Sequence, residues 1–164
     1  MKIEIKKILC PVDFSENAAY ATRYALALAE EYNAELILLQ VTHVPAVTAS
    51  DYYSDYPGCE LETTNTCIRE LQKSNNEQLE KLTADLRERH NCQISTRHET
   101  GKPFFEIIST AKKENVNLIV MGTHGHGRTS LRYILIGSTA EKVVRMAPCP
   151  VLTVKHPEHE FIVP

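Results

Sequence analysis

The sequence predicts an α/β protein made of a single doubly wound domain, in which helices cover both faces of a parallel sheet. Short apolar segments alternate along the chain with segments whose apolar residues recur at helical spacing, an order typical of this class. The length of 164 residues matches one ordinary domain, and a hydrophobic share of 43% is sufficient for a packed core. We therefore expect right-handed crossovers between successive parallel strands.

Five segments are predicted to be strands. Residues 3–12 and 35–41 are apolar runs rich in β-branched and aliphatic side chains, as in strands buried on both faces. Residues 92–98 alternate between apolar and polar, which predicts a third strand with one wetter face. Residues 116–121 and 150–154 are again short apolar runs and complete the sheet.

Four segments are predicted to be helices. Ser15 offers a hydroxyl that can cap the first of them. Its inward face is predicted from apolar residues at helical spacing: Ala18, Ala21, Ala25, Leu28 and Tyr32. The helix over residues 62–90 is predicted from the same kind of spacing: Ile68, Leu71, Leu79, Leu82 and Leu86. Pro103 favours a helix start and predicts a helix to about Glu114, and the last helix is expected over residues 138–146.

Charge and apolar run length exclude several classes of protein. Lys and Arg total 18 and Asp and Glu total 21, so the net charge of −3 argues against a nucleic-acid surface. No apolar run reaches the roughly 18–20 residues that a membrane helix needs, so no membrane segment is expected. The five cysteines include no Cys-x-x-Cys pair, which favours reduced thiols and a cytoplasmic location.

Polar residues and glycines follow three of the predicted strands. Ligands of open parallel sheets bind at the carboxyl ends of strands, where the strand order reverses. The candidates at these strand ends are Pro11, Val12, Asp13 and Ser15, then Val41 with Thr42 and His43, then Met121, Gly122, His124, Gly125, Gly127 and Arg128. Gly137, Ser138 and Thr139 open the next helix, whose amide groups and dipole favour an anion such as phosphate. Each segment alone also fits a tight connection or a helix cap, but their common edge of the sheet favours a ligand site.

Four segments resemble the universal stress protein family. They read ILCPVDFS at 8–15, VMGTHG at 120–125, GSTAEKV at 137–143 and APCPVLTV at 147–154. The resemblance implies that residues 1–155 form a universal stress protein-like nucleotide-binding domain, followed by a C-terminal tail at 156–164. It also implies a five-stranded sheet of order 3-2-1-4-5, with Asp13 and Gly122 at the switch point between strands one and four.

The resemblance further implies an adenine-nucleotide site. The positions that match the family's binding residues are Asp13, Val41, Gly122, Gly125, Gly137 and Ser138. The family pattern places nine residues between the second and third glycines, whereas eleven separate Gly125 from Gly137, so this loop is two residues longer. We expect ATP, or ADP or AMP, to bind here. Asp13 is a candidate for holding Mg²⁺ together with the nucleotide phosphates, and no metal site made by the protein alone is expected.

Three classes of function remain open. The first is a stress-response or signalling protein that binds adenine nucleotide and changes its contacts with a regulatory protein partner. The second is an interaction protein that uses no nucleotide, like the non-binding members of the family. The third is an enzyme such as a slow ATPase, which is disfavoured because no catalytic base or nucleophile can be placed from the sequence.

Further residues have two interpretations each. His124 and His126 alternate in the glycine-rich segment, but no set of histidines has zinc-like spacing. Arg128 and Arg132 are predicted either to contact phosphate or to be solvated charges on an exposed loop. Strand order 3-2-1-4-5 leaves residues 150–154 at an edge, and resembling proteins pair this strand with its copy, so a homodimer is expected.

Overall fold

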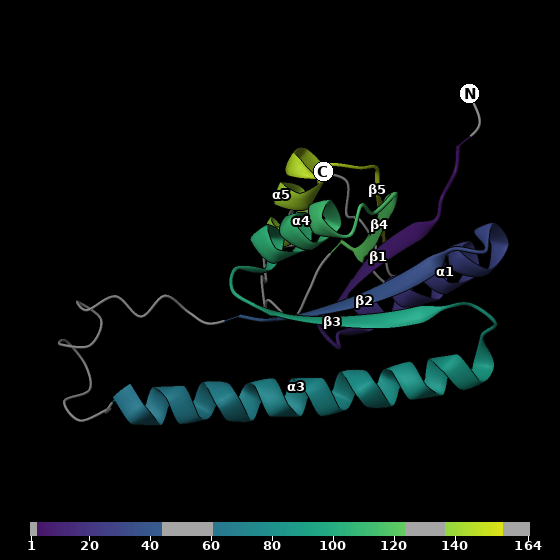
Figure 1. Cartoon of the computed structure of the whole chain (residues 1–164). Coiled ribbons are helices and arrows are strands. Elements are labelled where there is room, and N and C mark those ends of the chain that lie inside the picture. The colour runs from purple at the N-terminus through teal and green to yellow at the C-terminus, as the bar shows by residue number, and fades with distance from the viewer. Residues whose placement is uncertain (1–2, 44–60, 124–136, 156–164) are drawn as a thin grey trace, which may run out of the picture.

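The computed structural model describes residues 3–43, 61–123 and 137–155 (Figure 1). Its strands form one parallel sheet of order β3-β2-β1-β4-β5, which confirms the predicted fold class and strand order. The strands are β1 (Lys7–Val12), β2 (Glu35–Thr42), β3 (Ile94–Thr100), β4 (Leu118–Gly122) and β5 (Val151–Val154). The order reverses between β1 and β4, because β1 pairs with β2 on one side and with β4 on the other.

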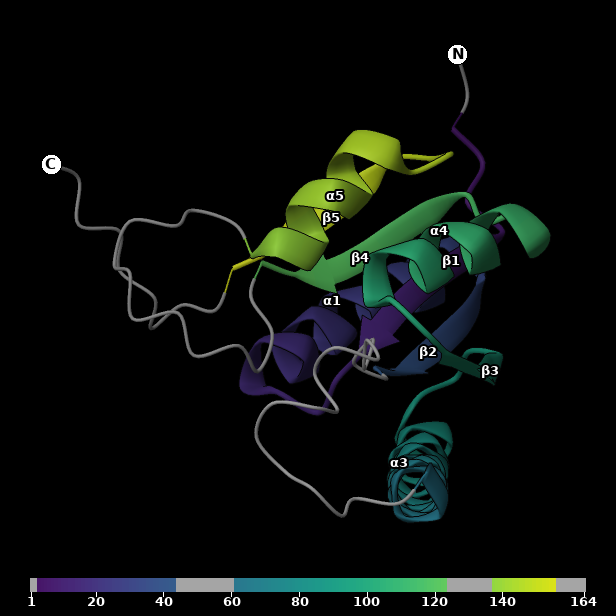
Figure 2. The same ribbon diagram turned by 90° about the vertical axis from the view of Figure 1, so that its left-hand side faces the viewer.

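The helices lie on both faces of the sheet (Figure 2). One face is covered by α1 (Glu16–Tyr32) and α3 (Leu61–Arg89), and the other by α4 (Pro103–Lys113) and α5 (Ser138–Met146). None of the helices among the described residues combines the length and the apolar character needed to cross a membrane.

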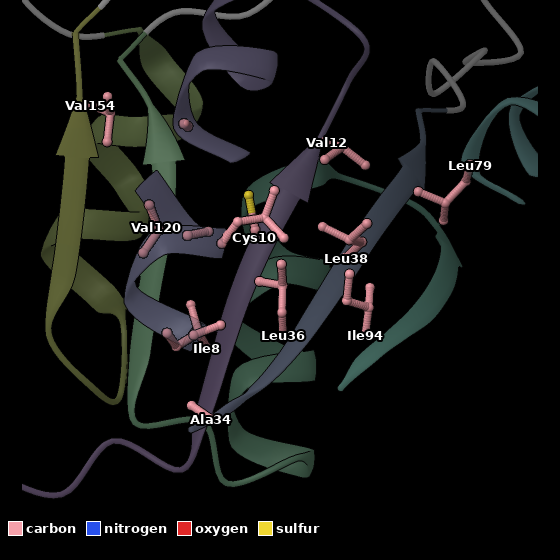
Figure 3. Packing of buried hydrophobic residues seen from close by; sticks show 14 residues of the cluster. Ile8, Cys10, Val12, Ala34, Leu36, Leu38, Leu79, Ile94, Val120 and Val154 are labelled. Carbon is pink, nitrogen blue, oxygen red and sulfur yellow. The ribbon is translucent and has the colours of Figure 1, made fainter. Parts of the chain in front are cut away.

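The sheet separates two hydrophobic cores. Ile8 and Cys10 of β1 point into the core beneath α1 and α3, whereas Leu9 between them points into the core beneath α4 and α5. Figure 3 shows part of the first core, where side chains of β1 and β2 meet Leu79 from α3. Each central strand is therefore buried on both faces, which explains its continuous apolar sequence.

The first strand is shorter than predicted. Residues 3–12 were expected to be extended throughout, but β1 begins at Lys7, where its pairing with Glu35 of β2 also begins. The Glu35 N–H donates to Lys6 O at 2.9 Å, and no ladder pairing precedes Lys7, so residues 3–6 lie outside the strand. The third strand, predicted at residues 92–98, instead begins at Ile94 and ends at Thr100, which pairs with Thr42 of β2.

Helix α1 confirms the predicted cap and most of the predicted inward face. The Ser15 hydroxyl accepts a hydrogen bond from the backbone N–H of Ala18 at 3.2 Å. Tyr32 was wrongly assigned to the inward face, since it is 45% exposed. The inward row continues to Ala29, which is fully buried, and Asn33 then ends the helix in a left-handed conformation.

Helix α3 presents polar residues to the sheet at two positions. Leu71 was predicted to face inward but is 48% exposed. Gln72 Nε2 instead donates to Thr100 Oγ1 at 2.9 Å, and Asn75 Nδ2 donates to Thr42 Oγ1 at 3.2 Å. The apolar spacing was correct at Leu79, Leu82 and Leu86, which lie in or against the core, but wrong at Leu71. Near Leu71 the inward positions are filled by amides that satisfy hydroxyls at the ends of β2 and β3.

Ion pairs tie the end of α4 to the strands. Arg97 Nε donates to Glu114 Oε1 at 2.7 Å, and Lys7 Nζ lies 3.6 Å from Glu114 Oε2. The hydrogen bond from Arg97, assisted by the charges of Arg97 and Lys7, holds the pKa of Glu114 below its usual value. A carboxyl group with a lowered pKa in the folded state stabilises the fold once the pH exceeds its unfolded pKa.

We expect Glu114→Gln to lower the free energy of unfolding by about 1 kcal/mol at pH 7. The stabilisation by Glu114 should be lost as the pH falls through its folded-state pKa, so the difference between the two proteins should shrink toward pH 3. Urea unfolding followed by circular dichroism at both pH values measures this. A difference as large at pH 3 as at pH 7 would contradict an electrostatic origin.

Candidate functional site

A cavity of about 410 Å³ opens at the carboxyl edge of the sheet, where β2, β1 and β4 end. Its volume is within the range of about 300–1,000 Å³ that is usual for small-molecule sites. Except for Ser15 and Thr42, every predicted site residue that the structure describes lines it: Pro11, Val12, Asp13, Val41, His43, Met121, Gly122, Gly137, Ser138 and Thr139. The fold therefore brings together, at one edge of the sheet, residues that are far apart in the sequence and that were selected because they follow strand ends.

Other predicted residues cannot be placed. His124, Gly125, Gly127 and Arg128 lie outside the described residues, and so does Arg132. The described part of the site therefore consists of the strand ends and the start of α5, without the segment between Thr123 and Gly137.

Ser15 contributes to the site through Asp13. It is 8% exposed and does not line the cavity. Its hydroxyl donates to Asp13 Oδ1 at 2.5 Å, and its backbone N–H donates to the same oxygen at 3.1 Å. These two bonds fix the orientation of the Asp13 carboxylate at the cavity, while the Ser15 oxygen also caps α1.

The two ends of the cavity differ in chemistry. On the β2 and α4 side the walls are the apolar side chains of Leu39, Val41, Pro103 and Ile107, with His43 beside them. On the β4 and α5 side the walls contain, besides the apolar Met121 and Ala140, the glycines and hydroxyl-bearing residues Gly122, Thr123, Gly137, Ser138 and Thr139. A ligand with a flat apolar group at one end and a polar or anionic group at the other matches this arrangement.

The start of α5 is suited to an anion. Gly137 is its N-cap residue and has no side chain that could cap the amide groups of the first turn. The helix dipole adds partial positive charge at the same place. The Gly137 N–H donates to Thr123 O at 2.7 Å, and the Thr123 N–H donates to Val154 O at 3.1 Å. These bonds hold the start of α5 against β4 and β5, independently of the residues between 123 and 137.

Gly122 has a packing role that the sequence did not reveal. A Cβ atom added to it would lie 3.1 Å from the backbone carbon and oxygen of Asn17 in α1. That distance is too short for ordinary contact, so glycine here permits the first turn of α1 to approach the end of β4. The sequence had indicated Gly122 only as a candidate binding residue at the end of a strand.

Several lining residues were missed by the sequence analysis. They are Ala18, Leu39, Pro103, Ile107 and Ala140. A signal for some of them existed: Leu39 precedes Val41 by two positions, and alternate residues of a strand share a face. Pro103 and Ile107 belong to the helix after β3, and only its tertiary position brings them over the ends of the neighbouring strands.

The thiols and carboxylates offer little for catalysis. Burial raises the pKa of Cys10 to about 12, so this thiol stays protonated and unreactive. Within residues 3–43, 61–123 and 137–155, no three metal-ligating side chains come together. Asp13 can supply one carboxylate oxygen to a cation that also takes ligands from elsewhere.

Comparison with known proteins places the chain in a family. Residues 4–155 match the family model of the universal stress proteins. The chain belongs to this family. Universal stress protein MJ0531 of Methanocaldococcus jannaschii is 36% identical over 155 residues, which cover 94% of this chain and 85% of that protein.

Solved structures of universal stress proteins share the fold. The structure of MJ0577 from the same organism superposes with a TM-score of 0.78 at 31% identity, covering 95% of this chain and 99% of that one. A universal stress protein solved in complex with cAMP superposes with a TM-score of 0.56 at 20% identity, covering 93% and 98% of the two chains. The latter likeness shows the fold alone.

Proposed function

We propose that this universal stress protein binds adenine nucleotide, with ATP as the preferred ligand, in the cavity between β1 and β4. One observation carries the proposal: a cavity of suitable volume joins an apolar end to the uncapped start of α5. Adenine is flat and largely apolar, and phosphates are anions that helix N-termini bind. A universal stress protein of the same fold has been solved with cAMP, which is itself an adenine nucleotide.

The lining residues define how the nucleotide would lie. The base fits between Val41 and Ile107, the ribose lies near Asp13, whose carboxylate can accept hydrogen bonds from sugar hydroxyls, and the phosphates lie at Ser138 and Thr139. A Mg²⁺ ion bound to the phosphates would neutralise their charge, and Asp13 is the described carboxylate placed to hold it. The protein's own contribution is binding and orientation, and we propose no catalytic step.

Nucleotide binding suits a cytoplasmic stress-response or signalling role, in which occupancy of the cavity changes contacts with a regulatory protein. The cavity lies at the ends of β2 and β1 and at the starts of α4 and α5, so a ligand touches elements from both halves of the sheet. Closure of these elements around a nucleotide would alter the surface beside the cavity.

Isothermal titration calorimetry with ATP, ADP and AMP tests the proposal. We expect all three to bind and ATP to bind most tightly, because the sequence predicts charge-assisted bonds from Arg128, which lies outside the described residues, to the terminal phosphate. Arg128→Ala should then weaken ATP binding by about 1.5–3 kcal/mol while AMP binding changes little. Arg145→Ala is the matched control, since Arg145 is an exposed arginine of α5 that does not line the cavity.

Two results would count against this. No heat with ATP for the unmodified protein would overturn nucleotide binding and favour an interaction protein that uses no nucleotide. An unchanged ratio of ATP to AMP affinity in Arg128→Ala would show that Arg128 does not contact the phosphates.

We also propose that two copies of the chain pair through β5. Among the described strands, β5 has a neighbour on one side only. Apolar side chains are exposed on β5 and on the helix before it: Leu152 of β5 is 37% exposed, and Val144 of α5 is 47% exposed. An open strand edge flanked by apolar side chains favours pairing with another strand.

A further inference from the structure

His43 is held against the turn that joins β3 to α4. It directly follows β2, and its ring Nδ1 lies 3.3 Å from the backbone oxygen of Gly101. The Gly101 N–H in turn donates to the backbone oxygen of Thr42 at 3.0 Å. The backbone and the ring at the end of β2 thus both contact the same glycine of the turn.

The turn beside the His43 ring requires glycine at position 101. Gly101 has a φ of +154°, a conformation that other residues rarely adopt, and a Cβ atom there would lie 2.5 Å from Glu106 Oε1. Pro103 occupies the first turn of α4 and restricts the backbone further. The conformation that presents the Gly101 oxygen to His43 therefore depends on glycine at this position.

The contact with Gly101 determines which nitrogen of His43 carries the proton. A carbonyl oxygen can only accept a hydrogen bond, so Nδ1 must be the donor. In a neutral imidazole the other nitrogen is then an acceptor. Because Nδ1 is engaged by the backbone, Nε2 is the nitrogen left to face a ligand.

This acceptor lies at the apolar end of the cavity. His43 lines the cavity together with the β2 and α4 side chains Leu39, Val41, Pro103 and Ile107. None of those four side chains can form a hydrogen bond, so among the described lining residues of β2 and α4, His43 alone offers a polar side chain.

We propose that Nε2 of His43 distinguishes the 6-amino purine from the 6-oxo purine by accepting a hydrogen bond from the amino group of adenine. The inference rests on the proposed nucleotide binding and names a specificity-determining residue for it. A 6-oxo purine such as hypoxanthine presents a carbonyl oxygen to Nε2, so two acceptors face each other and one is left without a partner.

Calorimetry with ATP and inosine triphosphate at pH 8 tests the assignment. We expect the unmodified protein to bind ATP about 5- to 10-fold more tightly than inosine triphosphate, as one hydrogen bond allows. His43→Phe keeps an aromatic ring of similar shape, and the affinity ratio should fall to about 1. His98→Phe is the matched control, because His98 is exposed on β3 and does not line the cavity, and the ratio should not change.

The outcomes separate the two proposals. If His43→Phe binds ATP with an unchanged preference over inosine triphosphate, the role of His43 is overturned while nucleotide binding stands. If the unmodified protein binds neither nucleotide, the proposed function itself fails. ¹⁵N NMR of the free protein gives an independent check: the Nδ1–H tautomer of His43 is expected, and the Nε2–H tautomer would overturn the assignment.

Discussion

Gly122→Val should abolish detectable ATP binding and lower the melting temperature of the free protein. The new Cβ would lie 3.1 Å from the Asn17 backbone, and the two further methyl groups need still more space. Forcing side-chain atoms into a packed contact costs about 1–3 kcal/mol. For a protein of this size that corresponds to a fall in melting temperature of about 3–10 °C.

The loss of binding would have two causes. Strain at position 122 moves backbone that lines the cavity, and the new side chain also displaces the first turn of α1, which is capped by Ser15, the residue that orients Asp13. Gly122→Ala adds the Cβ alone and should give an intermediate effect on both quantities.

Thermal unfolding without nucleotide and calorimetry with ATP separate packing from binding. Ala19→Val is the control, since it also creates a valine, by adding two methyl-sized groups on the exposed side of the first turn of α1, and should leave both quantities nearly unchanged. An unchanged melting temperature in Gly122→Val would contradict the packing role. Full ATP affinity in that variant would place the nucleotide elsewhere.

Thr153→Pro should convert a dimer into a monomer. The Ile119 N–H donates to Pro150 O at 3.0 Å, and the Thr123 N–H donates to Val154 O at 3.1 Å. Residues of a parallel strand alternate in the direction of their backbone groups, so the N–H of Thr153 points away from β4 to the open edge. Proline removes that one donor, leaves the bonds to β4 in place, and is tolerated on edge strands.

Light scattering coupled to size-exclusion chromatography measures the result. The unmodified protein should have twice the chain mass of 18.5 kDa, and Thr153→Pro should have the mass of one chain. Thr153→Val keeps the N–H and a β-branched shape, so it should remain dimeric. A monomer for the unmodified protein at high concentration, or a dimer for Thr153→Pro, would refute pairing through β5.

Local patterns in the sequence were sufficient for the fold class. Alternation of apolar runs with helical spacing predicted the strands and helices, and Ser15 was correctly identified as the cap of α1. These features depend on residues within one or two turns of each other, so a single stretch of sequence contains the whole signal. Strand ends and the start of α5 likewise indicated most of the described cavity wall before its shape was known.

Tertiary structure alone decided the features that join distant segments. Position 122 must be glycine because the backbone of Asn17 lies against it. Gln72 and Asn75 face inward because they donate hydrogen bonds to hydroxyls at the ends of β3 and β2. The ring of His43 is oriented by its contact with Gly101. In each case the partner lies far along the chain. Periodicity records which face of an element is apolar, whereas the identity of the atoms that meet across two elements depends on how those elements pack.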